Sequence, residues 1–325
     1  MSISETLKPF ACIFLIITLL SCCFCSCSEE RKTVDIKYRR AAALHSERTE
    51  WGIERICEDD FEILSLYAAQ AFVYDVTERK YVYISGADKI LYPASVTKLL
   101  TALYSLELLS PDELITPGDE LLLKNEKSSI AFIKKHHKLS VEMLIEALLL
   151  PSGGDAAFVL AAAGGYKIGG REIGAEKAVE LFLGGMNEYA KEKIGMCGSN
   201  FTSPDGFYDP ANYSTVEDMT LLSIAASQNE LIMKYASLPE ANVTYASGHT
   251  NTWKNTNRML HKESEYYSPY VTGLKTGTLE GNSCLVCTFS LGEREYIAGV
   301  FSEKSEELRY VDMTAIIEFC EALQS

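Results

Sequence analysis

The sequence lacks an excess of basic residues. Its 30 Lys and Arg stand against 45 Asp and Glu, and the formal net charge is −15 at pH 7. Nucleic acids and anionic lipid surfaces attract proteins through a basic field, so the charge argues against both as the main partner. An anionic substrate would need a local cation in its binding site, because the chain as a whole repels it.

The chain also lacks a disulfide framework. Five of its ten cysteines lie within residues 12–27, and the other five are scattered: Cys57, Cys197, Cys284, Cys287 and Cys320. The C-x-x-C pair in SCLVCTFSL lies in a pattern that predicts a strand, where residues i and i+3 point to opposite faces. We therefore expect these two side chains to pack in the core, and to form neither a metal site nor a disulfide.

Metal-ligand spacing is absent from the histidines. The five are His45, His136, His137, His249 and His261, and none lies in an H-E-x-x-H motif or a similar arrangement. This disfavours a zinc peptidase, and we expect no metal or other cofactor. The KKHHK segment that holds two of them is interpreted as the solvated end of a helix.

The apolar run near the N-terminus is too short for an ordinary membrane span. It extends from Phe10 to Phe24, with roughly 15 apolar residues against the ~20 that a span requires. Residues 1–28 are therefore predicted to be a signal sequence or an N-terminal anchor of an exported protein. Cleavage after Ser28, lipid attachment at Cys22 and an uncleaved anchor stay open. Residues 29–64 are rich in charge and predict a linker.

Strand patterns lie at both ends of the remaining chain, with helical patterns between them. AFVYDVTERKYVYISG predicts a hairpin, and SCLVCTFSL and EYIAGVFS predict another around Gly292. The closing ELRYVDMTAIIEFCEAL is typical of a helix, as are ASVTKLLTALYSLELL, AVELFLGGMNEYAKEKIG and VEMLIEALLL, the last with Ser140 as its N-cap.

This order predicts an α+β fold. The two ends of the chain pair in one antiparallel sheet, formed by residues of about 65–95 and 260–325, and helices flank it. Residues of about 96–259 form an inserted, mainly helical subdomain. Antiparallel hairpins in place of β-α-β alternation argue against a doubly wound sheet.

The segment YPASVTKLL brings a nucleophile and a base together. Ser95 and Lys98 are three residues apart near the start of a helix, so they lie on one face and can touch. A serine hydroxyl needs an adjacent base to attack a carbonyl, and a lysine can serve when burial or a neighbouring cation lowers its pKa. The helix N-terminus favours the anion formed on attack.

Two later segments carry further polar groups. In LLLPSGGDAA, Ser152 precedes Gly153 and Gly154, and adjacent glycines are typical of a helix end because a left-handed backbone costs them little. In GLKTGT, Lys275 and Thr276 lie at the start or edge of a strand and form a plausible carboxylate site. Gly277 follows them and lets a ligand approach the backbone closely.

The three motifs Ser-x-x-Lys, Ser-Gly-x and Lys-Thr-Gly, in this order, are those of penicillin-binding proteins and class A β-lactamases. The chain also resembles the D-alanyl-D-alanine carboxypeptidases, the low-molecular-mass penicillin-binding proteins, from Ala68 to Leu323, including SGGDAA, NFTSPDGFYDPANYSTVEDMTLLS and NTNRML. The resemblance implies a β-lactamase/transpeptidase-like catalytic domain over residues 65–325.

The resemblance also implies an activity. A serine hydrolase of this family removes the terminal D-alanine from peptidoglycan stem peptides that end in D-Ala-D-Ala, through an acyl-enzyme and without a metal. β-Lactams are covalent inhibitors of such an enzyme.

The resemblance further implies a role for each motif residue. Ser95 attacks the carbonyl between the two D-alanines, Lys98 accepts and returns the proton, and Ser152 relays it to the departing amine. The substrate's carboxylate is held by Lys275 and Thr276, and the oxyanion hole consists of the backbone N–H groups of Ser95 and Thr278.

The sequence departs from the family pattern in two places. Gly154 stands where the family usually has Asn, and losing such a polar contact can lower a rate on the order of a hundredfold. An impaired penicillin-binding or peptidoglycan-binding protein is therefore one alternative, and a serine β-lactamase is a less favoured one. Many relatives also carry a β-rich C-terminal domain and an amphipathic tail after the catalytic domain, whereas this sequence stops soon after its last predicted helix. Membrane contact is therefore expected only through the N-terminus.

Overall fold

The structure is a computed structural model that describes residues 64–87 and 89–324. The described residues belong to one compact unit, Ile63–Ser325. The predicted signal sequence or anchor, and all but the last residue of the predicted charged linker, lie outside the described residues.

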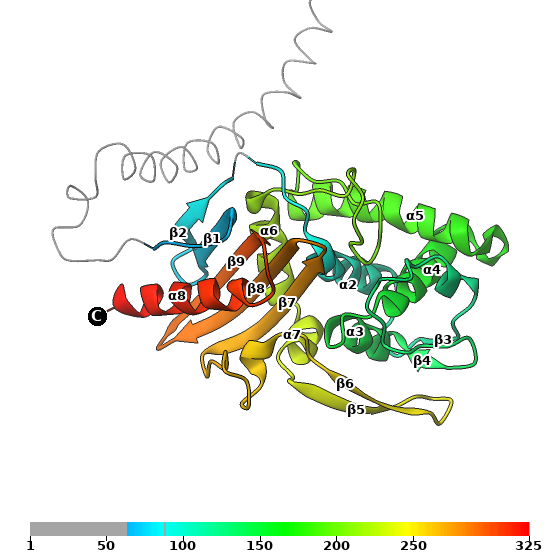
Figure 1. The fold of residues 1–325 in the computed structure, drawn as a ribbon. Coiled ribbons are helices and arrows are strands. Elements are labelled where there is room, and N and C mark those ends of the chain that lie inside the picture. Colours follow the sequence, from blue (N-terminus) through cyan, green and yellow to red (C-terminus); the bar gives the residue numbers. More distant parts are fainter. Residues whose placement is uncertain (1–63, 88, 325) are drawn as a thin grey trace, which may run out of the picture. The chain divides into compact units, whose positions relative to one another are not determined.

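A five-stranded antiparallel sheet is the centre of the fold (Figure 1). Its strand order is β2-β1-β9-β8-β7, so the first hairpin of the chain lies beside the last. The strands are β1 (Gln70–Asp75), β2 (Lys80–Ser85), β7 (Val271–Leu279), β8 (Asn282–Leu291) and β9 (Arg294–Glu303). Strands β1 and β9 pair from Gln70 opposite Phe301 to Asp75 opposite Tyr296, which confirms the predicted pairing of the two ends of the chain.

Helices occupy the sequence between the two groups of strands, and one more helix follows the last strand. They are α2 (Thr97–Leu108), α3 (Val141–Leu149), α4 (Gly154–Gly169), α5 (Gly174–Tyr189), α6 (Val216–Ser227), α7 (Glu230–Ala236) and the closing α8 (Leu308–Ala322). Helix α8 packs against β8 and β9, whereas α6 contacts β1 and β9 from behind the sheet as drawn in Figure 1. The predicted α+β fold with a mainly helical insertion is confirmed.

The predicted N-cap and the predicted burial of the C-x-x-C cysteines are both confirmed. The hydroxyl of Ser140 accepts a hydrogen bond from the Met143 amide at 3.1 Å, so it is the N-cap of α3 as expected. Cys284 and Cys287 are buried on opposite faces of β8 and are not bonded to each other. Cys287 belongs to the core under α8, while the Cys284 thiol contacts the Tyr92 carbonyl oxygen.

Two short antiparallel strand pairs within the helical region were not predicted. Strands β3 (Leu114–Ile115) and β4 (Leu139–Ser140) pair, and so do β5 (Glu240–Thr244) and β6 (Thr250–Lys254). Strands β3 and β4 have only two residues each, and β5 and β6 have five mainly polar residues each, so their patterns gave little strand signal.

The interpretation of KKHHK as a helix end is wrong. His136 and His137 lie in a turn and loop before β4, and His137 is only 5% exposed. The cause is a long-range contact, because Tyr245, next to β5, packs on the His137 ring with centroids 4.8 Å apart. A local charge pattern does not contain this information.

Among the described residues, no helix has the length and apolar character needed to cross a membrane.

Candidate active site

One cleft of about 1270 Å³ brings the three sequence motifs together. Ser95, Lys98, Ser152, Thr276 and Thr278 all line it. These side chains come from α2 and the turn before it, from the loop between α3 and α4, and from β7. The two remaining motif residues, Lys275 and Gly277, are buried within β7 and are not lining residues.

Ser95 and Lys98 are in direct contact. Ser95 lies in a short 3-10 turn, Ala94–Val96, that continues into α2. The ammonium of Lys98 donates one hydrogen bond to Ser95 Oγ at 2.8 Å and another to the Asp205 carbonyl oxygen at 2.7 Å. Because the lysine is only 1% exposed, these protein acceptors replace the water that would otherwise solvate it.

The burial of Lys98 prepares it to act as a base. Burial lowers the pKa of its ammonium to about 8, although the negative charges of Asp205 and Asp155 act in the opposite direction. A lysine with this pKa carries a useful neutral fraction near neutral pH. It can therefore take the Ser95 proton, which an ordinary lysine, almost fully charged, would do rarely.

The turn that carries Ser95 is packed closely on two sides. A Cβ on Gly206 would lie 1.9 Å from the Ala94 carbonyl oxygen, and one on Gly277 would lie 2.9 Å from Ala94 Cβ and 3.3 Å from Ser95 N. Ala94 itself has a φ of +50°, a conformation that costs a non-glycine residue of order 1 kcal/mol and is characteristic of functional sites. Glycine at 206 and 277 allows this close packing.

In the second motif it is Ser152, with a φ of +60°, that has the left-handed backbone. The expectation that the glycines supply it is wrong, because Gly154 opens α4 and Gly153 is its N-cap. These glycines serve close packing instead. The Gly154 amide donates to the Ser129 carbonyl oxygen at 2.7 Å, and a Cβ on Gly153 would lie 2.8 Å from the Ala147 carbonyl oxygen.

A buried carboxylate occupies the space beside Gly154. A Cβ on this glycine would lie 2.8 Å from Asp205 Oδ2, and the same oxygen accepts a hydrogen bond from Ser128 Oγ at 2.6 Å. The other carboxylate oxygen accepts from Ser203 Oγ and the Phe207 amide. Burial raises the pKa of Asp205, but the Lys98 charge and these hydrogen bonds outweigh it and leave the pKa below its usual value. Sequence analysis did not identify Asp205.

The Lys-Thr-Gly motif lies in the interior of β7, which is an edge strand of the sheet, and not at the start of that strand. The buried Lys275 ammonium donates to the Thr276 carbonyl oxygen at 3.0 Å. Burial, followed by the positive charges of Lys98 and Arg309, holds its pKa well below the usual value. Thr276 Oγ1 lies 2.5 Å from Thr256 Oγ1, at the wall of the cleft.

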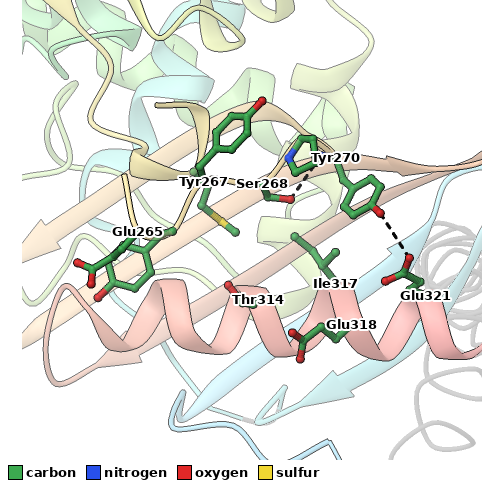
Figure 2. A pocket seen from close by; sticks show the side chains of 11 residues that line it. Glu265, Tyr267, Ser268, Tyr270, Thr314, Ile317, Glu318 and Glu321 are labelled. Atoms are coloured by element: carbon green, nitrogen blue, oxygen red, sulfur yellow. Dashed lines mark hydrogen bonds between the residues drawn. The ribbon is translucent and has the colours of Figure 1, made fainter. Parts of the chain in front are cut away.

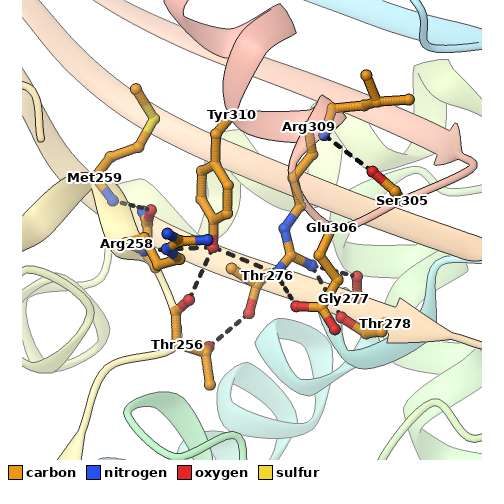
Figure 3. Close-up of polar contacts among 12 residues, drawn as sticks. Thr256, Arg258, Met259, Thr276, Gly277, Thr278, Ser305, Glu306, Arg309 and Tyr310 are labelled. Atoms are coloured by element: carbon orange, nitrogen blue, oxygen red, sulfur yellow. Dashed lines mark hydrogen bonds and ion pairs between the residues drawn. The ribbon is translucent and has the colours of Figure 1, made fainter. Parts of the chain in front are cut away.

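Arg309 is a further cation of the cleft that sequence analysis missed (Figure 3). From the start of α8, its guanidinium donates to the Gly277 carbonyl oxygen at 3.0 Å and to Thr278 Oγ1 at 2.9 Å. It also pairs with Glu306 at 2.9 Å, while its buried Nε has no partner among the described residues. No local motif marks this arginine, because only the folded sheet brings α8 to β7.

A second, smaller pocket of about 260 Å³ lies between α8 and the loop of residues 265–270 (Figure 2). Tyrosines and the carboxylates of Glu265, Glu318 and Glu321 line it, and no Lys, Arg or His does. It therefore offers no cation to a carboxylate-bearing substrate, unlike the larger cleft.

Comparison with known proteins agrees with this geometry. A family model described as D-alanyl-D-alanine carboxypeptidase matches residues 58–305. The chain belongs to this family. Among curated members, it is 32% identical over 253 residues to a D-alanyl-D-alanine carboxypeptidase of Streptomyces sp. K15, covering 74% of this chain and 83% of that one. It is 28% identical over 263 residues to DacF of Bacillus subtilis, covering 78% of this chain and 61% of the relative.

The chain thus spans about three fifths of the length of some carboxypeptidase relatives. Solved structures are also similar to the chain. The Streptomyces K15 DD-transpeptidase superimposes with a TM-score of 0.71 at 28% identity, covering 79% of this chain and 98% of that one. Penicillin-binding protein D2 from Listeria monocytogenes, in its ampicillin-bound form, gives a TM-score of 0.63 at 29% identity, with 79% and 99% covered.

Removing the charge of Asp205 should change the titration of Lys98. We expect Asp205→Asn to lower the pKa of the lysine below about 8, because the carboxylate favours the charged ammonium. The ¹³Cε shift of Lys98, assigned with Lys98→Gln and followed against pH by NMR, measures this. Asp209→Asn, which removes an exposed carboxylate nearby in the sequence, should leave the titration unchanged. An unchanged pKa in Asp205→Asn would contradict the electrostatic assignment.

Proposed function

We propose that this chain is a serine-type D-Ala-D-Ala carboxypeptidase that removes the terminal D-alanine from peptidoglycan stem peptides through an acyl-enzyme on Ser95. The hydrogen bond of 2.8 Å from the buried Lys98 to Ser95 supports this most directly. Family membership supports the same reaction class. The proposed catalytic domain spans residues 65–325.

In the proposed acylation step, neutral Lys98 takes the proton of Ser95 Oγ as the oxygen attacks the carbonyl carbon between the two D-alanines. We assign the oxyanion hole to the backbone N–H groups of Ser95 and Thr278. The close approach of β7 to the turn that carries Ser95 supports this assignment. Lys98, with Ser152 as relay, returns the proton to the departing amine. Water then hydrolyses the ester and regenerates Ser95.

The terminal carboxylate of the substrate is proposed to bind between β7 and α8. Thr276 and Thr278 line the cleft there, and the Arg309 guanidinium lies behind them. Lys275 is buried and directed at the Thr276 carbonyl oxygen, and in its charged form it adds positive potential beneath this site. These two cations supply the local attraction that a chain of net charge −15 must provide.

Asp205 is proposed to take over from the missing carboxamide at position 154. Its carboxylate fills the space beside Gly154, although its negative charge raises the pKa of Lys98 and so disfavours the neutral base. The site therefore retains a polar oxygen near the base, although from a different element of the fold. This favours an active enzyme over an impaired one.

An extracytoplasmic location follows from the proposed substrate. Peptidoglycan lies outside the cytoplasmic membrane, and residues 1–28 are the proposed export signal or anchor. Membrane contact is proposed only through that segment, and β-lactams are the proposed covalent inhibitors.

The activity itself is tested with the full chain and a pentapeptide ending in D-Ala-D-Ala. We expect release of D-alanine, and a loss of at least about a thousandfold in Ser95→Ala, because the nucleophile is removed. Ser237→Ala, at an exposed serine, should retain the activity. Labelled penicillin followed by peptide mapping should place the adduct on Ser95.

Other outcomes of this experiment discriminate the alternatives. A penicillin adduct without D-alanine release would indicate an impaired penicillin-binding protein. Rapid turnover of the penicillin adduct would indicate a β-lactamase. An adduct on another residue would refute the assignment of Ser95.

The pH dependence of acylation should follow Lys98. Only the neutral lysine accepts a proton, and its pKa is lowered to about 8, so the ammonium predominates below this pH. We expect the rate of acylation by penicillin to rise with pH up to about 8 and then to level. A rate that is flat between about pH 6 and 10 would exclude Lys98 as the base.

Restoring the family's asparagine should impair this particular site. We expect Gly154→Asn to slow acylation on the order of tenfold, because its Cβ would crowd the buried Asp205 carboxylate. Gly154→Ala should slow it similarly, since it introduces the same Cβ. The double variant Gly154→Asn with Asp205→Ala removes the crowding carboxylate, so it should react faster than Gly154→Asn or Gly154→Ala. Faster acylation by Gly154→Asn alone would show that the site lacks only the carboxamide.

A further inference from the structure

Three histidines gather at one place outside the cleft. His136 and His137 precede β4, and His249 lies in the turn between β5 and β6, more than a hundred residues later. Their ring centroids are 4.6 Å apart for His136 and His137, 4.9 Å for His136 and His249, and 4.6 Å for His137 and His249. One ring nitrogen from each lies within 4.8 Å of those of the other two.

We propose that His136, His137 and His249 bind a divalent transition-metal ion of the Zn²⁺ or Ni²⁺ class, which ties the loop before β4 to the β5–β6 hairpin. Imidazole nitrogen is a preferred ligand of these ions, whereas Mg²⁺ and Ca²⁺ prefer oxygen. Metal–nitrogen bonds of about 2.0–2.1 Å place ligand nitrogens about 3.3 Å apart. Small rotations of the two exposed rings close that distance, and water completes the coordination.

The surroundings hold two of the rings in place. His137 is buried, its Nδ1 accepts the Lys134 amide at 3.1 Å, and its ring packs on Tyr245. His249 Nδ1 lies 3.2 Å from Ser247 Oγ, which also accepts the Lys138 amide at 3.1 Å. When His249 Nδ1 carries the ring proton and donates it in a hydrogen bond to this hydroxyl, Nε2 is left to bind the metal. Such a hydrogen bond commonly orients metal-binding histidines.

Two features oppose binding and limit its strength. A metal on either nitrogen of His137 displaces the hydrogen bond from Lys134, since Nδ1 must then hold the metal or the ring's proton. Lys134, Lys135 and Lys138 are also exposed in the same loop and repel a cation. The site is therefore expected to be weaker than a closed four-ligand zinc site.

The role we assign to the metal is structural. None of the three histidines lines the cleft that contains Ser95. The loop and the hairpin already meet at Ala131, whose carbonyl oxygen accepts from Trp253 Nε1 at 3.1 Å and Asn251 Nδ2 at 3.0 Å. A bound ion would add a second link further along the same pair of segments, and acyl transfer would not pass through it.

The test is metal binding by the untagged full chain. Isothermal titration with ZnCl₂ or NiCl₂ should show one equivalent bound that His249→Ala and His136→Ala both lose. The same salts should raise the melting temperature of the wild type by a few degrees, reversed by EDTA, and MgCl₂ should have no effect. Both variants should still form the penicillin adduct, because neither residue belongs to the cleft.

A matched control uses a histidine outside the cluster. His261→Gln should keep both the bound equivalent and the thermal shift. Metal held by cysteines elsewhere in the chain would persist in His249→Ala, so it does not affect the difference between the two proteins. Equal binding by wild type and His249→Ala, or an equal loss in His261→Gln, would overturn the proposal.

Discussion

The active site depends on keeping the Lys98 ammonium out of water. Lowering its pKa to about 8 from an ordinary value costs about 3 kcal/mol of folding stability at neutral pH, where the unfolded chain keeps the lysine charged at no such cost. That cost disappears above the unfolded pKa and is fully present below about pH 8. Two acceptors, Ser95 Oγ and the Asp205 carbonyl oxygen, replace water around the ammonium and keep this cost from being larger.

Much of the surrounding packing serves this arrangement. The turn of Ser95 packs between β7 and the turn at Gly206. Gly277 and Gly206 lie so close to Ala94 that a side chain at either position would clash with it. The Asp205 residue that precedes this glycine contributes both its carbonyl oxygen and its carboxylate to the lysine's surroundings. A single tight turn therefore packs against the turn of Ser95, binds the Lys98 ammonium and fills the space beside Gly154.

Elements with a strong local signal were predicted well. The two hairpins, helix α2 and the Ser140 cap follow from periodicity and capping chemistry that a short window contains. The contact between Ser95 and Lys98 follows from helical spacing alone. Where several weak motifs occurred in order, they also indicated the family, because their order along the chain restricts the choice more than any one of them.

Residues whose role depends on distant partners were missed or misread. Arg309 looked like part of an amphipathic helix, and His137 like part of a solvated basic patch. Both are buried because β7 and the β5–β6 hairpin, respectively, come to them in the folded chain. The neighbour of Gly154, the Asp205 carboxylate, lies about fifty residues away along the chain, so the sequence around the glycine does not show it.

The sequence by itself determined the strand and helix order, the contact of Ser95 with Lys98, and the family. The tertiary structure alone decided the surroundings of Ser95 and Lys98: the desolvation of the lysine, the Asp205 carboxylate near it and the Arg309 guanidinium beside β7. The reason is physical, since spacing along a chain specifies which neighbours share a face, whereas burial and electrostatic potential arise only when segments far apart in the sequence pack together.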